Sequence, residues 1–79
     1  MRVRVHVFLK SGVLDPQGRA IHHALEGLGF GGVSDVRAGK LFELDLAETD
    51  PEKARAAADQ MAAKLLANPV IESWRVELP

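Results

Sequence analysis

The sequence predicts an α+β fold of the ferredoxin-like type, a βαββαβ two-layer sandwich in which two helices cover one face of an antiparallel sheet. Two observations lead to this prediction. Both ends of the chain alternate apolar and polar residues, as half-buried strands do, and two internal segments repeat apolar residues at helical spacing. The chain has 79 residues, so we expect a single domain spanning residues 1–79.

The first half of the chain is expected to form a strand and then a helix. Residues 2–10 alternate, with valines on one face and mainly charged side chains on the other. Asp15 stands before a proline, which is typical of a helix N-cap followed by the first helical residue, and we expect this helix over residues 16–28. Glycines within residues 27–32 end the helix, and Phe30 is expected to fold back beneath it.

A β-hairpin is expected next. Residues 33–38 and 41–47 have strand patterns, and Gly39-Lys40 between them suits a turn. In the βαββαβ topology the first strand lies between the third and the fourth, so its arginines should face carboxylates of both neighbours across the open face of the sheet. The charged residues expected on this face are Arg2, Arg4, Glu43, Asp45 and Glu77.

A second helix and a last strand complete the pattern. The helix has two candidate N-caps, Thr49 and Asp50. Its apolar stripe of alanine, methionine and leucine runs over residues 54–66, and Asn68-Pro69 ends it because proline cannot continue a helix. Residues 70–78 alternate again and are expected to form the fourth strand.

Composition favours a small protein with protein partners. With 10 basic and 11 acidic residues the formal charge is -1, which gives no long-range attraction to nucleic acid or to an anionic membrane. The sequence has no cysteine and no metal-ligand spacing, so neither a disulfide nor a metal is expected to stabilise the fold. A domain of this size buries only about 60% of the surface that its unfolded chain exposes. We therefore expect at least a homodimer.

The expected cellular location is the cytoplasm. The N-terminal residues alternate instead of forming a long apolar run, so we expect neither a signal peptide nor a membrane span.

No catalytic constellation can be assembled from the sequence. His22 and His23 are adjacent and point about 100° apart on a helix, and His6 lies on a strand, so the histidines are not expected to converge. No serine or threonine has the context of an activated nucleophile. Only Phe8 supplies an aromatic ring to the open face, where RNA-binding sheets need several, so nucleic-acid binding is not expected.

One alternative function stays open. Regulatory modules of this fold class bind small molecules at dimer seams through glycine-rich loops and backbone groups, so a small-molecule-binding regulatory module is the second candidate. Lys10, Gly12 and Gly18 near the start of the first helix offer a candidate anion site, although a tight turn with a cap explains them more simply.

Three short strings stand at the joints between the expected elements. They are Lys10 through Gly18, Val36 through Lys40 followed by Phe42-Glu43-Leu44, and Leu65 through Glu72. Together, in this order and spacing and in a chain of this length, they resemble the small PurS subunit family of phosphoribosylformylglycinamidine synthase. The resemblance spans nearly the whole chain.

The resemblance implies a role in purine biosynthesis, where formylglycinamide ribonucleotide, ATP and glutamine give formylglycinamidine ribonucleotide, ADP, phosphate and glutamate. It implies that a PurL-type synthetase uses ATP and Mg, that a PurQ-type glutaminase releases ammonia from glutamine, and that the small subunit binds no cofactor itself. We therefore expect a non-catalytic subunit, in a homodimer or higher homo-oligomer. It would bridge the synthetase and the glutaminase so that ammonia from glutamine reaches the ATP-activated formylglycinamide ribonucleotide. The residues expected at partner or self interfaces are Lys10, Asp15, Pro16, Gly18, Arg37, Gly39, Lys40, Asn68, Pro69 and Glu72.

Overall fold

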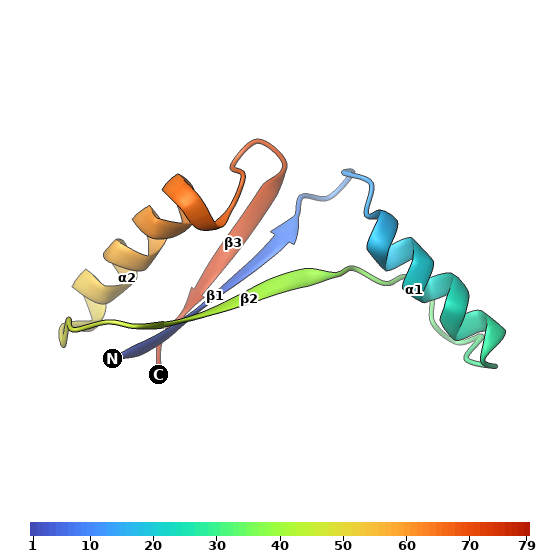
Figure 1. Cartoon of the computed structure of the whole chain (residues 1–79), viewed down its shortest axis with the longest axis horizontal. Coiled ribbons are helices and arrows are strands. Elements are labelled where there is room, and N and C mark those ends of the chain that lie inside the picture. Colours follow the sequence, from blue (N-terminus) through green and yellow to red (C-terminus); the bar gives the residue numbers. More distant parts are fainter.

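The computed structural model describes residues 1–79 and has an α+β, ferredoxin-like arrangement, as predicted (Figure 1). Along the chain the elements are β1 (Arg2–Leu9), α1 (Pro16–Gly27), β2 (Gly39–Asp45), α2 (Pro51–Met61), a short π-helical turn η1 (Ala62–Leu66) and β3 (Glu72–Glu77). Neither α-helix is long and apolar enough to cross a lipid bilayer.

The sheet has the order β2-β1-β3, with both pairs antiparallel, so the prediction that the first strand lies in the middle is confirmed. Side chains alternate between the two faces along each strand. Val5 pairs with Val76 on the face that α2 covers. Arg4 pairs with Glu43 on one side and Glu77 on the other, and these charged side chains lie on the open face, as predicted.

The core lies between β1 and α2. Three valines of β1 are buried beneath three alanines of α2 and η1: Val3, Val5, Val7, Ala54, Ala58 and Ala62. The small alanine side chains let the helix approach the sheet closely. Two further contacts hold α2 to β3: the Trp74 indole donates to Asp59 at 2.8 Å, and the Arg55 guanidinium donates to the Val76 carbonyl at 3.2 Å.

The ends of α2 agree with the prediction only in part. Asp50 is the N-cap, because its carboxylate accepts the Glu52 N–H at 2.9 Å, and this decides between the two candidates. The apolar stripe was expected to face the core as far as residue 66, but Met61 and Leu65 are exposed. The π-helical turn accounts for Leu65, since its wider turn shifts which of residues 62–66 face the sheet.

The expected hairpin is wrong. Residues 33–38 form no strand, and the sheet has three strands instead of four. Side chains bond the two ends of this segment instead: His22 donates to the Val33 carbonyl at 2.7 Å, and the Ala38 N–H donates to Asp15 at 2.8 Å. A segment bonded in this way needs no neighbouring strand. The outer edge of β2 is therefore unpaired.

The prediction that both helices cover the sheet is also wrong for α1, which lies at the opposite end of the molecule from α2 (Figure 1). In the predicted topology α1 would lead back to a second strand, and with that strand absent nothing returns it to the sheet. The radius of gyration is 15.6 Å, against about 12 Å for a compact domain of this length. Phe30 is 58% exposed, so the expected plug beneath the helix does not form.

Candidate functional site

Five of the predicted interface residues meet where the sheet joins α1. They line a cavity of about 350 Å³, which we call the junction cavity: Asp15, Pro16, Gly39, Lys40 and Glu72. They come from the start of α1, the start of β2 and the start of β3. The three resembling strings therefore converge in space, although they lie far apart in the sequence.

Asp15 joins the two segments that connect the sheet with α1. Its carboxylate accepts the Gly18 N–H at 2.8 Å, as a helix N-cap does, and the Ala38 N–H at 2.8 Å. The residue is only 4% exposed. The hydrogen bonds from Gly18 and Ala38 favour the charged form and hold the pKa of Asp15 below its ordinary value of 3.8. The predicted N-cap is confirmed, whereas the bond to Ala38 was not foreseen.

Gly18 and Arg37 complete this connection. A Cβ atom at position 18 would lie 2.2 Å from the Val36 carbonyl oxygen, so only glycine lets the two segments pass this closely. The guanidinium of Arg37 donates to three backbone carbonyls at the end of β1 and in the segment after it, those of Leu9 at 3.4 Å, Lys10 at 3.2 Å and Val13 at 3.2 Å. We call Asp15, Gly18 and Arg37, with these contacts, the α1 clamp. It fixes the direction in which α1 leaves the sheet.

Lys40 and Glu72 face each other from the two edge strands. The Lys40 ammonium lies 3.7 Å from one carboxylate oxygen of Glu72, and the other oxygen accepts the Asn68 N–H at 2.7 Å. Asn68 also accepts the Val70 N–H on its side chain at 3.0 Å, which shapes the turn that contains Pro69. Glu72 therefore connects this turn with the junction cavity.

Lys10 is a predicted interface residue whose side chain makes no ion pair in the structure. Its backbone N–H donates to the Ile71 carbonyl at 2.8 Å, and its carbonyl accepts from Arg37. Its exposed ammonium takes part in none of the ion pairs of the chain. Lys10 thus contributes its backbone to the junction and leaves its charge in solvent.

The histidines lie in separate environments. His6 on β1 is 2.8 Å from Glu77, and this hydrogen bond lowers the pKa of Glu77 below its ordinary value of 4.5. His22 on α1 is 3.2 Å from Glu26 and holds the segment after α1. No group of three or more His, Asp or Glu side chains lies close enough to hold a metal ion. The polar contacts of this site hold loops and strands in fixed relative positions.

An exposed apolar face on α1 is a feature that the sequence did not predict. Ile21 on α1 and Leu28 at its C-terminal cap are exposed. On the helix side of β2, Phe42 and Leu44 are only partly buried, because α2 packs mainly over β1 and β3. The signal that could have revealed it is the weak strand propensity of residues 33–38, which include Ser34, Asp35 and Ala38. Without that strand, α1 has no route back to the sheet.

Comparison with known proteins identifies the family. A family model described as PurS, phosphoribosylformylglycinamidine (FGAM) synthase, matches residues 2–79. The chain belongs to the PurS family. The PurS subunit of phosphoribosylformylglycinamidine synthase from Mycobacterium leprae is 49% identical over 75 residues, 95% of this chain and 91% of that protein. The PurS subunit from Bacillus subtilis is 46% identical over 77 residues, 98% and 90% of the two chains.

Solved PurS structures share the fold. The crystal structure of PurS from Methanocaldococcus jannaschii, one of the subunits of formylglycinamide ribonucleotide amidotransferase in the purine biosynthetic pathway, has a TM-score of 0.87 and 39% identity, covering 96% of this chain and 92% of that chain. A chain of the PurLQS structure from Thermotoga maritima has a TM-score of 0.87 and 30% identity, covering 96% and 93%. The resemblance of the three strings to PurS is therefore confirmed.

Proposed function

We propose that this chain is the small, non-catalytic assembly subunit of phosphoribosylformylglycinamidine synthase in purine biosynthesis. The observation that carries the proposal is the PurS match over residues 2–79, together with PurS relatives that bear this name over most of their length. The site geometry supports it, because the polar groups of the α1 clamp hold the chain's own segments together. No buried side-chain nitrogen or oxygen lacks a hydrogen-bond partner.

The role in the complex is to hold two active sites in register. Ammonia released from glutamine has to reach the ATP-activated formylglycinamide ribonucleotide before it takes up a proton and diffuses away, so the two sites need a fixed, water-poor junction. In this proposal the PurL-type subunit uses ATP and Mg, the PurQ-type subunit uses glutamine, and this chain binds none of them. The complex acts in the cytoplasm, with its metabolite substrates.

The chain does this work as a homodimer or higher homo-oligomer. Leu28 is 73% exposed at the end of the apolar face of α1. A domain this small buries little apolar surface by itself, so it gains stability when a second copy buries this face. The helix side of β2 is the complementary surface, because Phe42 and Leu44 are only partly buried there. The α1 clamp keeps each chain from closing on itself. Two copies therefore exchange α1, and each helix covers the vacant half of the partner's sheet.

Matched variants of α1 test the homodimer. Ile21→Gln together with Leu28→Gln places polar groups on the apolar face, and His23→Gln is the control because His23 is an exposed polar residue of the same helix. Light scattering should give a dimer or larger species for wild type and control, and a shift toward monomer for the double variant. A double variant that self-associates like wild type would exclude this face as the contact.

Reconstitution tests the assembly role. The chain is mixed with the synthetase and glutaminase subunits of its own organism, and complex size and glutamine-dependent FGAM formation are measured. We expect a larger species, and glutamine-dependent activity that needs all three chains. Turnover of substrate by this chain alone would contradict the proposal. A ligand-dependent rise in its melting temperature without any effect on the other subunits would favour the small-molecule module instead.

A further inference from the structure

The backbone of residues 33–38 is largely unpaired. The Val33 carbonyl and the Ala38 N–H are the only backbone groups of this segment that hydrogen-bond within the chain. Three of the four residues between them are exposed, so water satisfies their N–H and carbonyl groups in the isolated chain. Apart from the Val36 carbonyl, which faces Gly18, these groups are open to another strand.

The segment is extended and continues directly into β2. Residues 33–38 contain no turn and no bend, and none of them has a positive φ. With β2 they form one stretch over residues 33–45, which spans about 40 Å at the usual rise of a strand. Only β2 has a neighbour, and β1 pairs with it on one side alone. The stretch therefore has an unpaired first half and a free outer edge along its second half.

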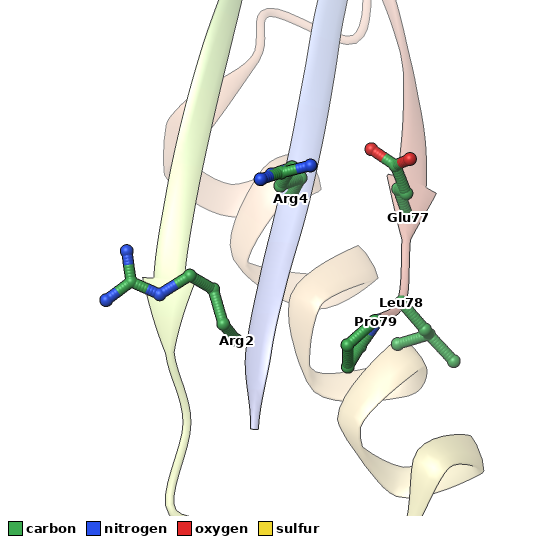
Figure 2. A pocket seen from close by; sticks show the side chains of 5 residues that line it. All are labelled: Arg2, Arg4, Glu77, Leu78 and Pro79. Atoms are coloured by element: carbon green, nitrogen blue, oxygen red, sulfur yellow. The ribbon is translucent and has the colours of Figure 1, made fainter.

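The two edge strands of the sheet differ in their protection. At β3 the Arg55 guanidinium donates to the Val76 carbonyl at 3.2 Å. Figure 2 shows Leu78 and Pro79 directly after this strand, and proline has no N–H to offer a further strand. No side chain bonds to the backbone of residues 39–45 in β2. An unprotected edge of this kind is a template for another strand.

We propose that residues 33–38 of one copy pair with the outer edge of β2 of a second copy, as the fourth strand of its sheet. The pairing is reciprocal. When residues 33–45 of two copies lie antiparallel about a two-fold axis, the unpaired half of each meets the free edge of the other. A strand from any other protein would fill the edge of β2 and leave residues 33–38 of this chain unpaired. The pairing rests on the proposed homodimer and adds a backbone contact to it.

The exchange of α1 brings the segment to this edge. His22 on α1 bonds to Val33 at 2.7 Å, and Asp15 at the base of the helix bonds to Ala38 at 2.8 Å, so the helix and the segment stay together. When α1 covers the helix side of the partner's β2, the attached segment lies beside that strand. The weak strand propensity of residues 33–38 agrees with a strand that forms only against a partner.

NMR of the wild-type chain tests the pairing. Isotope-labelled and unlabelled chains are unfolded and refolded together, so that mixed homodimers form, and nuclear Overhauser contacts between the labelled and the unlabelled copy are recorded. We expect contacts between backbone protons of residues 33–38 in one copy and those of β2 in the other. Contacts between the copies at α1, without any between these two backbone segments, would overturn the inference.

A matched pair of variants tests the hydrogen bonds. Ser34→Pro with Asp35→Pro removes two N–H groups that have no partner within the chain, and proline keeps the backbone extended. The two N–H groups are adjacent and point to opposite sides of an extended strand, so one of them faces the partner. The control, Ser34→Ala with Asp35→Ala, removes the same side chains and keeps both N–H groups.

We expect the proline variant to self-associate at least about tenfold more weakly than the alanine control in sedimentation equilibrium. Circular dichroism checks that both variants keep their secondary structure. Equal association of the two variants would overturn the inference. If the proline variant does not fold, the contacts recorded in the wild-type chain decide.

Failure of the proposed homodimer has a different signature. If light scattering finds a monomer for the wild type, the homodimer falls, and the strand pairing falls with it. If the wild type is a dimer whose copies touch only through α1 and the helix side of β2, the strand pairing alone is wrong. Glutamine-dependent activity after reconstitution tests the assembly role separately from both results.

Discussion

The carboxylate of Asp15 accepts a hydrogen bond from the backbone N–H of Ala38 at 2.8 Å, although 23 residues separate the two. Through this bond the segment leaving β1 and the segment entering β2 are held together at the base of α1. The direction of α1 is therefore fixed within the chain, and the exposure of its apolar face follows from that direction. The stability of this junction can be measured separately from assembly.

Replacing Asp15 by asparagine should destabilise the fold. The Gly18 and Ala38 N–H groups bond to different oxygens of the carboxylate, and in an amide one of these positions is an NH₂ group, which cannot accept. We expect the melting temperature, followed by circular dichroism at fixed protein concentration, to fall by several degrees. Asp35→Asn is the control, since Asp35 is exposed in the same segment. Equal melting temperatures for Asp15→Asn and wild type would show that this bond adds nothing.

The contribution of Asp15 should disappear on acidification. Because its pKa in the folded chain lies below the ordinary 3.8, the carboxylate stabilises the fold above that pH, and the gain is lost as pH falls toward the lowered pKa. The gap in melting temperature between wild type and Asp15→Asn should be constant near neutrality and narrow below about pH 4. Glu77 also has a lowered pKa, so the comparison is repeated in a Glu77→Gln background. A gap that stays constant to the acid limit of folding would refute the assignment.

Two glycines of α1 should respond differently to alanine. Gly18→Ala places a methyl group 2.2 Å from the Val36 carbonyl oxygen, so the backbone has to move. We expect a loss of about 1–3 kcal/mol in the free energy of unfolding. Gly27→Ala has open space around the new methyl group and should be neutral or stabilising by up to about 1 kcal/mol. Chemical denaturation of both variants checks the contrast, and equal effects would mean that the close approach at Gly18 is unimportant.

The single tryptophan reports on the packing of α2. Its indole N–H donates to Asp59 at 2.8 Å. Asp59→Ala removes the acceptor and should lower stability by about 1 kcal/mol, whereas Asp59→Asn keeps an acceptor and should cost less. Intrinsic fluorescence in a denaturant titration measures both, since no other tryptophan interferes. An identical loss in the two variants would argue against the hydrogen bond as the cause.

Elements with a local cause could be predicted from the sequence. The alternation of residues 2–10 and the caps at Asp15 and Asp50 depend on neighbouring residues alone, and the structure has β1, α1 and α2 where they were expected. The central position of β1 followed from the topology. The charged open face followed from the alternation of side chains.

Features that depend on distant side chains could not be predicted. Residues 33–38 are kept out of the sheet by bonds to His22 and Asp15, and no local pattern encodes partners so far away in the chain. The uncovered face of α1 follows from that missing strand. For the site, the family resemblance pointed to joints that the structure brings together, but it could not tell that Lys40 meets Glu72 or that Lys10 contributes only its backbone.

The central claim, that two copies exchange α1, is tested most directly by cross-linking between chains. The sequence has no cysteine, so Ile21→Cys in one tagged version and Leu44→Cys in a differently tagged version are the only thiols in a mixed sample. After the subunits exchange, a short bis-maleimide should join the two versions into one heterodimer. Lys53→Cys, on the exposed surface of α2, should give no such product with Ile21→Cys. Absence of the Ile21–Leu44 product, with a monomer in light scattering, would contradict the claim.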